Sequence, residues 1–150
     1  MDLNELLGHS RTDVLDEAYV SLQRSHGTHY EREGESFTRE RLEELFTLVT
    51  AAIRTRDLAP LSAHAEHVAT DRFNHGFTIS EVQTAFNALE EAMWRRVVAK
   101  TPPQELAESI GLLSTVFGFA KDVMARTFVS LASRRHVPSL DLSAMFAGTE

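Results

Sequence analysis

The chain has 150 residues, of which 43% are hydrophobic and 25% charged, as expected for one globular domain. Its formal charge of −7 argues against a nucleic-acid-binding surface, because phosphate contacts need a basic field and the 15 Lys and Arg are scattered. The chain has no cysteine, which excludes disulfides, a thiolate nucleophile and cysteine metal sites.

The amino-terminal part lacks a long apolar run, so we expect no signal peptide, no membrane span and a cytoplasmic protein by default. Residues 1–10 are predicted to form an N-terminal arm, either a short helical turn or a frayed end. An apolar stripe from Thr12 to His26 predicts the first helix. The polar segment Gly27 to Ser36 contains two glycines and is predicted to be a connecting loop.

The middle of the chain predicts two further helices with short connections. Thr38 is expected to cap a helix that runs to about Arg56, because apolar residues recur three and four positions apart along it. Asp57 is expected to cap the next helix, with Pro60 tolerated in its first turn. Gly76 can adopt a left-handed conformation and is predicted to end that helix.

The clearest helix start lies in the stretch from Asp71 to Val98. Thr78 and Glu81 have the spacing of a capping box, in which each side chain bonds the backbone N–H of the other residue. Apolar residues from Ile79 to Val97 then recur at helical spacing. The sequence therefore predicts a long amphipathic helix here.

The last predicted helix starts at Thr101, with a Thr/Gln capping box and proline at the first helical position, and runs to about Arg135. It carries two apolar stripes, so it is either central in the fold or shared with a partner subunit. A strip of small residues would permit a close helix crossing, although each interior glycine costs roughly 1 kcal/mol relative to alanine. The candidate residues of a dimer interface are Gly111, Ser114, Thr115, Gly118, Leu112, Val116, Phe119 and Val123.

These elements predict an all-α bundle of about five to six helices with a long C-terminal helix, in a single domain spanning residues 1–150. Residues 139–150 are expected to be a tail or a linker to a next module.

The residues Arg72, Gly76-Phe77 and Glu81-Val82 close one helix and open a long one. This pattern resembles the N-terminal domain of RsbR-type co-antagonists, the sensory domains of stressosomes, and the similarity extends over roughly Thr38 to Leu131. The resemblance implies a globin-like fold without haem that dimerises through its last helices and passes a signal to an attached output domain.

The resemblance therefore implies a non-enzymatic sensory or regulatory homodimer in bacterial stress signalling, binding a small ligand or a partner protein. We expect no cofactor, and the charge and the lack of an apolar run predict no nucleic-acid partner and no membrane. Within the matching pattern, Glu81 is interpreted as a cap, and Arg72 as its charge partner or as a cation at a helix end. No nucleophile elbow or glycine-rich phosphate loop frames the serines and histidines, so no catalytic residue is predicted.

Histidines provide the alternative hypothesis. His64, His67 and Asp71 share one face of a predicted helix, and imidazole with carboxylate can bind zinc, iron or nickel. His64 or His67 would also be the axial ligand if the protein bound haem. The favoured interpretation is that these are solvated or interface histidines, and a pH-sensing role is a further alternative.

Overall fold

The computed structural model describes residues 2–25 and 28–136, and this part of the chain forms seven helices and no strand. The helices are α1 (Leu3–His9), α2 (Arg11–Arg24), α3 (Thr28–Glu33), α4 (Glu35–Thr55), α5 (Ala59–Asn74), α6 (Ile79–Lys100) and α7 (Pro103–His136). The predicted all-α class with a long last helix is confirmed, although the described residues form more helices than the predicted five to six. The predicted tail, residues 139–150, lies outside the described residues.

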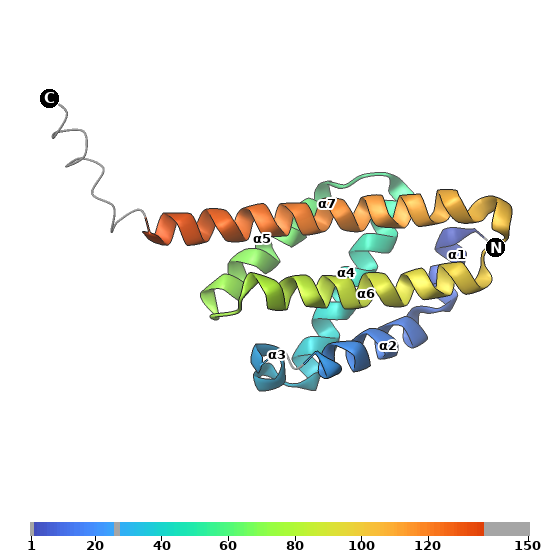
Figure 1. The fold of residues 1–150 in the computed structure, drawn as a ribbon. Coiled ribbons are helices and arrows are strands. Elements are labelled where there is room, and N and C mark those ends of the chain that lie inside the picture. Colours follow the sequence, from blue (N-terminus) through green and yellow to red (C-terminus); the bar gives the residue numbers. More distant parts are fainter. Residues whose placement is uncertain (1, 26–27, 137–150) are drawn as a thin grey trace, which may run out of the picture.

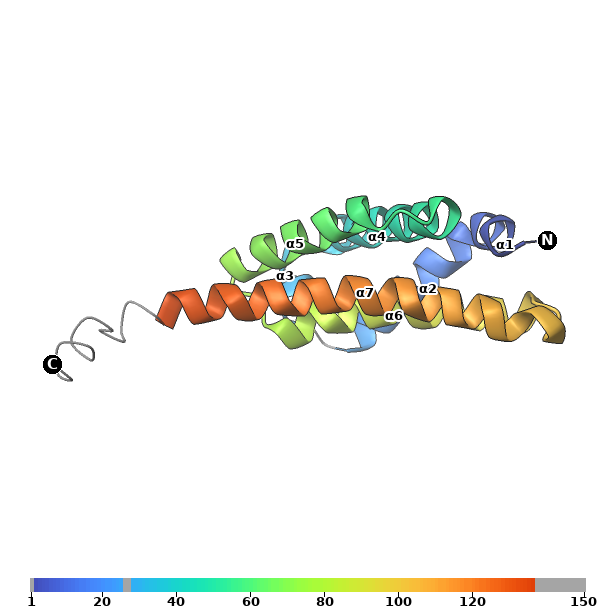
Figure 2. The same cartoon turned by 90° about the horizontal axis from the view of Figure 1, so that it is seen from above.

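The helices pack in two layers (Figures 1 and 2). In one layer α6 and α7 lie antiparallel and side by side, and α2 packs along α6. In the other layer α4 and α5 cross behind them, and α7 packs extensively on α5. All seven helices contribute buried apolar side chains to one core. No helix of the described residues is long and apolar enough to cross a membrane.

The predicted break between α5 and α6 is confirmed. Gly76 follows the end of α5 with a φ of 83°, in the left-handed region. The Thr78 hydroxyl accepts a hydrogen bond from the Glu81 N–H at 3.2 Å, and the Glu81 carboxylate accepts one from the Thr78 N–H at 3.1 Å. This is the reciprocal pair of a capping box, and it fixes where α6 begins.

The predicted cap at Thr38 is wrong. α4 begins at Glu35, so Thr38 lies inside the helix, and Gly34 occupies the cap position with a φ of 95°. The glycine lets the chain turn into the helix earlier than the Thr38 pattern suggests. The buried Thr38 hydroxyl instead donates to the Gly34 carbonyl at 3.0 Å.

The predicted role of Thr101 is also wrong. Thr101 terminates α6, where its backbone N–H donates to the Val97 carbonyl at 3.0 Å. α7 begins two residues later at Pro103, so the second of the two prolines, rather than the first, takes the first helical position.

Two segments of low periodicity contain short helices. The N-terminal arm contains the helix α1, which Asp2 caps by accepting from the Glu5 N–H at 2.8 Å and which buries Leu6 and Leu7. The predicted loop from Gly27 to Ser36 contains α3, and its Tyr30 is buried. α1 agrees with the short helical turn that was one of the two predictions for the arm, whereas α3 is too short for apolar periodicity to reveal it.

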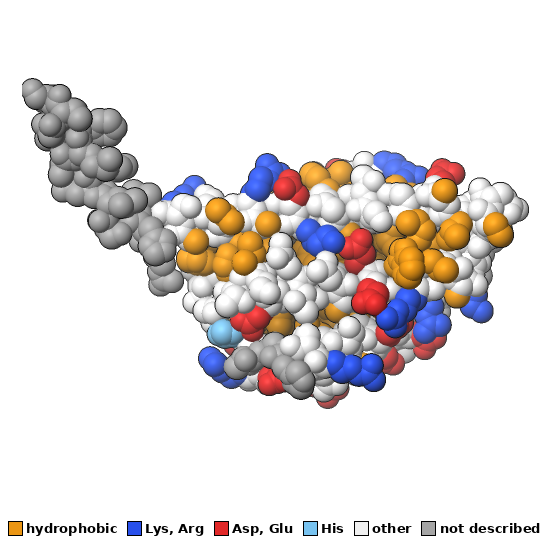
Figure 3. All heavy atoms as spheres, in the orientation of Figure 1, with side chains coloured by type: hydrophobic (Ala, Val, Ile, Leu, Met, Phe, Trp, Pro, Cys, Tyr) orange, Lys and Arg blue, Asp and Glu red, His pale blue; other side chains and the backbone are white. Residues whose placement is uncertain are grey.

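Large apolar side chains remain exposed on three helices: Val20 on α2, Trp94 and Val98 on α6, and Val129 on α7. Figure 3 shows apolar side chains gathered toward both ends of the face formed by α6 and α7, with charged side chains between them. The described chain therefore leaves part of this face uncovered.

Candidate functional site

An arginine lies in the interior of the bundle. Arg72 on α5 is only 2% exposed, which makes it the largest fully buried side chain of the described residues. It follows Leu61, Ala65 and Val68 at spacings of four, three and four, so it occupies the next position of the buried stripe of α5. This spacing is the sequence signal that would have revealed its burial.

Aromatic rings surround the Arg72 guanidinium group. Its central carbon lies 4.8 Å from the ring centroid of Phe37 and 5.7 Å from that of Phe77. Tyr30 contacts Phe77 edge to face, with 4.8 Å between the ring centroids. Cation–π attraction of this kind strengthens when the cation is removed from water. Asp71 forms an ion pair with Arg72 from the solvent side.

A small cavity of about 20 Å³ lies beside Arg72, where five helices meet. Its polar side chains are Tyr30, Thr38, Arg41, His64 and Arg72. The rest of its wall is apolar and consists of Leu22, Leu42, Leu45, Val68, Ala85 and Phe86. We call it the arginine cavity. Its volume suits a group of one or two heavy atoms the size of water.

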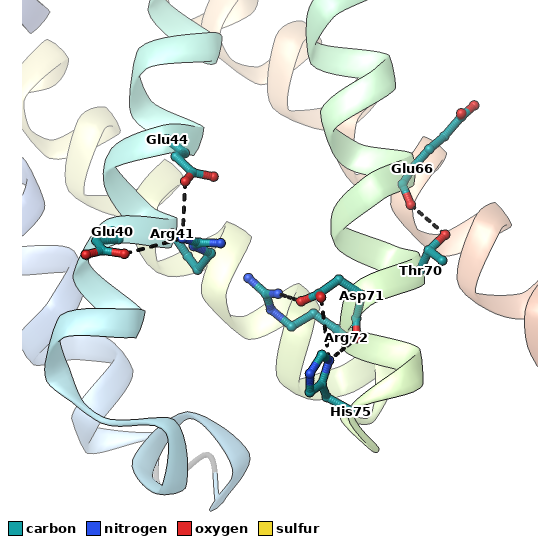
Figure 4. Close-up of polar contacts among 8 residues, drawn as sticks. All are labelled: Glu40, Arg41, Glu44, Glu66, Thr70, Asp71, Arg72 and His75. Carbon is teal, nitrogen blue, oxygen red and sulfur yellow. Dashed lines mark hydrogen bonds and ion pairs between the residues drawn. The ribbon is translucent and has the colours of Figure 1, made fainter.

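Two guanidinium groups approach the arginine cavity from opposite helices. Figure 4 shows Arg41 on α4 and Arg72 on α5 pointing toward each other across the space between the helices. Arg41 pairs through Nη2 with Glu44 at 3.3 Å and Glu40 at 3.4 Å. The Nε atoms of both arginines are buried and have no hydrogen-bond partner among the described residues. Buried donors without an acceptor are rare in folded proteins, so this pair requires an explanation.

The other titratable groups of the cavity are neutral at neutral pH. Burial lowers the pKa of His64, and the nearby positive charges of Arg72 and Arg41 lower it further, against the opposing charge of Glu44. Burial raises the pKa of Tyr30, although the positive charge of Arg72 opposes this rise. Among the described residues, the two guanidinium groups are therefore the only charges lining the cavity.

Glu81 does not pair with Arg72, so the interpretation of Arg72 as the charge partner of Glu81 is wrong, whereas the alternative of a cation at a helix end agrees with its place in the last turn of α5. Besides capping α6, the Glu81 carboxylate accepts from the His29 backbone N–H at 3.0 Å and from its ring Nδ1 at 2.7 Å. A carboxylate only accepts, so Nδ1 carries the proton. Burial acts to raise the pKa of Glu81, but hydrogen bonds from Thr78 and His29 outweigh it and lower the pKa. One carboxylate thus joins α3 to the start of α6.

The structure does not assemble the alternative metal site. The Asp71 carboxylate pairs with Arg72 and lies 3.5 Å from Nδ1 of His75. His67 is exposed, whereas His64 lines the arginine cavity. Among residues 2–25 and 28–136, no group of three His, Cys, Asp or Glu is placed to hold a metal ion. The cavity beside His64 is also far smaller than a porphyrin.

The candidate dimer-interface residues divide into two sets. Those of the small-residue strip are all exposed: Gly111, Ser114, Thr115 and Gly118. The larger ones lie partly or wholly inside the subunit, Leu112 and Phe119 half-buried and Val116 and Val123 buried. A Cβ added at either glycine would meet no described atom within 4 Å, so the described chain gives no packing reason for them.

Comparison with known proteins identifies the family. The family described as RsbT co-antagonist protein rsbRD N-terminal domain matches residues 8–138, which confirms the resemblance drawn from Arg72, Gly76 and Glu81. Searches of the curated proteins and of the solved structures gave no match. The chain belongs to the family of N-terminal domains of RsbT co-antagonist proteins, a family of regulatory domains in signalling.

Proposed function

We propose that this chain is a non-enzymatic sensory domain that forms a homodimer through α6 and α7 and passes a signal to a partner protein or an attached output domain. Its family supports the regulatory role. The observation that carries the dimer is the uncovered face of α6 and α7. The globin-like relationship and the cytoplasmic location stay predictions.

A cross-helix ion pair defines which residues share that face. Lys121 of α7 contacts Glu90 of α6 at 2.6 Å. Trp94 and Val98 lie four and eight positions after Glu90 and therefore on the same side of α6. On α7, Gly118, Ser114 and Gly111 precede Lys121 at spacings of three and four, so they share its side of the helix. Because the helices are antiparallel, the two series lie side by side (Figure 1). We define the outer face as Trp94, Val98, Gly111, Ser114 and Gly118.

The outer face has the properties of a helix-packing surface. Trp94 and Val98 are 44% and 42% exposed, so covering each one contributes somewhat less than half of the about 1.5–3 kcal/mol gained when a fully exposed large apolar side chain is buried. In a two-fold dimer each contact occurs twice. The absence of side chains at Gly111 and Gly118 would let a second backbone approach closely, which accounts for two glycines in the middle of a long helix.

Light scattering coupled to size exclusion tests the dimer at micromolar protein concentration. The wild-type chain is expected to have the dimer mass, and Gly118→Arg the monomer mass, because the added charge lies in the proposed contact. Ala63→Arg, at an exposed position of α5, is the matched control and is expected to remain dimeric. A wild-type monomer, or a Gly118→Arg dimer of unchanged affinity, would refute the proposed interface.

A further inference from the structure

We infer that a pocket between α2, α3 and α4 binds a small alkylated ammonium ion. The arginine cavity is too small for such an ion, but this larger pocket shares Leu22, Tyr30 and Thr38 with its wall. The assignment deepens the proposed sensory function and rests on it for its biological meaning, since it names the class of ligand that the domain would detect. The binding itself depends only on the residues of the pocket.

The pocket has a buried floor and an exposed rim. Its volume of about 180 Å³ suits a ligand of roughly six heavy atoms, because a water-sized atom takes up about 30 Å³ in a liquid. Four buried side chains form the floor: Tyr19, Leu22, Tyr30 and Thr38. Three exposed side chains form the rim: Gln23, Glu31 and Glu35. We call it the tyrosine pocket.

A glycine keeps the tyrosine pocket open. Gly34 lines it between α3 and α4 with a φ of 95°, and an added Cβ would meet no described atom within 4 Å. The polar groups of the floor are engaged within the chain. The Thr38 hydroxyl donates to the Gly34 carbonyl at 3.0 Å, and the Tyr19 hydroxyl accepts from the Gln23 amide at 3.0 Å. The floor therefore offers a ligand mainly apolar and aromatic surface.

The rim supplies negative charge. Glu31 and Glu35 are both carboxylates, and no Lys or Arg of the described residues lines the pocket. Glu35 accepts from Arg39 Nε at 3.1 Å, but its side chain is 62% exposed, and a carboxylate has further acceptor positions. The whole chain has a formal charge of −7. An acidic rim on an acidic chain attracts cations and repels anions.

An arginine beside the pocket already makes this kind of contact within the chain. The central carbon of the Arg39 guanidinium group lies 4.2 Å from the ring centroid of Tyr19, and the same group pairs with Asp16 and Glu35. Arg39 is not part of the pocket wall, so it does not fill the pocket. Tyrosine rings and carboxylates thus hold a cation next to the pocket, and the pocket wall presents the same two kinds of group.

The floor and the rim together select the class of ligand. A primary ammonium group needs acceptors for three N–H donors, which an apolar and aromatic floor does not supply. An alkylated ammonium group donates few hydrogen bonds or none, and aromatic rings attract it through cation–π contacts. Its alkyl groups suit the apolar floor, and its charge suits the carboxylates of the rim. Choline has this chemistry and a size that fits the pocket.

Proton–nitrogen NMR spectra of the labelled full chain test this inference. Choline chloride is the probe. The control is neohexanol, in which a neutral carbon replaces the charged nitrogen of choline, and sodium chloride keeps the ionic strength equal. Choline is expected to shift the Gly34 backbone amide and the Gln23 side-chain amide saturably, with one common midpoint. Neohexanol is expected to bind at least tenfold more weakly, because it lacks the charge.

Variants separate the charge from the rings. The double variant Glu31→Gln with Glu35→Gln keeps the shape of the rim, and choline affinity is expected to fall about tenfold. Its control is Glu43→Gln with Glu66→Gln, which removes two exposed carboxylates outside the pocket wall and is expected to bind choline as the wild type does.

The ring of Tyr19 is tested by a pair of changes. Tyr19→Leu is expected to weaken choline binding at least threefold, whereas Tyr19→Phe, which keeps the ring, is expected to bind like the wild type. If Tyr19→Leu fails to fold, the double variant of the rim still decides the outcome.

The same ammonium group occurs in a lipid headgroup, so phosphatidylcholine vesicles form a second arm of the experiment. The acidic rim repels the headgroup phosphate, and the chain is expected to stay in solution when the vesicles are sedimented. Sedimentation that free choline competes away would assign the group to a lipid and would overturn the assignment to a free molecule.

Three further outcomes would overturn the assignment: no saturable shift with choline, equal affinity for choline and neohexanol, or unchanged choline affinity in the double variant of the rim. Failure of the pocket and failure of the dimer are distinguishable. Choline binding by a wild-type monomer keeps the pocket and refutes the dimer, whereas a dimer whose Gly34 and Gln23 signals ignore choline does the reverse.

Discussion

Replacing Gly111 and Gly118 with alanine is expected to stabilise the isolated subunit and to weaken the dimer. Both residues lie in the interior of α7, both are exposed, and an added Cβ would meet no described atom within 4 Å. In the subunit alone, alanine therefore changes only the helix propensity. In the proposed dimer, the same Cβ atoms would enter the closest contact between the two helices.

The two effects have opposite signs and similar sizes. Each Gly→Ala change favours an exposed helix by about 1 kcal/mol. The two sites lie about 10 Å apart along the helix, so their effects should add to about 2 kcal/mol. For a domain of this size that raises the melting temperature of the monomer by about 4–8 °C. Overpacking at a close helix contact costs about 1–3 kcal/mol for each site, which weakens the dimer roughly tenfold or more.

The assay is thermal unfolding over a wide range of protein concentrations, with light scattering to give the dissociation constant of the dimer. The double variant should melt above the wild type when both are dilute and monomeric. As the concentration rises, this advantage should shrink or reverse, because the wild type gains more from association. A higher melting temperature at every concentration, with an unchanged dissociation constant, would refute the view that these glycines serve a helix contact between subunits.

Three further changes test the site and its supports. Arg72→Ala should lower the free energy of unfolding by about 2–5 kcal/mol in urea titrations, whereas Arg72→Met, which keeps the buried stem, should change it by less than about 1.5 kcal/mol. Equal losses in both would show that the charge itself stabilises the fold. Because hydrogen bonds lower the folded-state pKa of Glu81, its stabilisation is present above the unfolded glutamate pKa of about 4.3 and is lost as the pH falls through the folded value. Glu81→Gln should therefore reduce stability at neutral pH and flatten its decline in acid, and a decline as steep as the wild type's would contradict this. Gly76→Ala should cost about 1–2 kcal/mol in the same titrations, since its φ of 83° disfavours any side chain, and an unchanged midpoint would show that the turn relaxes freely.

The sequence predicts long helices well because their signals are local and redundant. α6 begins where the capping box of Thr78 and Glu81 places it, and the left-handed Gly76 separates it from α5. Such local signals have a limit at Thr38. A threonine before a helix rich in glutamate is typical of an N-cap, but α4 already begins at Glu35 with Gly34 in the cap position. α1 and α3 are held by tertiary contacts more than by their own periodicity, so the pattern left a helical turn and a frayed end both open at α1 and predicted a loop at α3.

The arginine cavity was less predictable for a different reason. Its walls come from five helices, and only their packing brings Tyr30, Arg41 and Arg72 together. The stripe of α5 did contain a clue, since Arg72 occupies a buried position where an apolar residue is expected. His64 and His67 were candidate metal ligands because imidazole can bind metals, but only His64 lines the cavity and His67 is exposed.

The double use of the Glu81 carboxylate links two parts of the molecule that are far apart in sequence. The same oxygens that cap α6 hold α3 through His29, and α3 carries Tyr30, one wall of the arginine cavity. If α3 swings outward, the first turn of α6 loses two hydrogen bonds to its capping carboxylate and frays more easily. Amide hydrogen exchange at Val82 and its neighbours would then become faster whenever α3 moves away from the cavity. Exchange at the start of α6 therefore reports whether the cavity is closed.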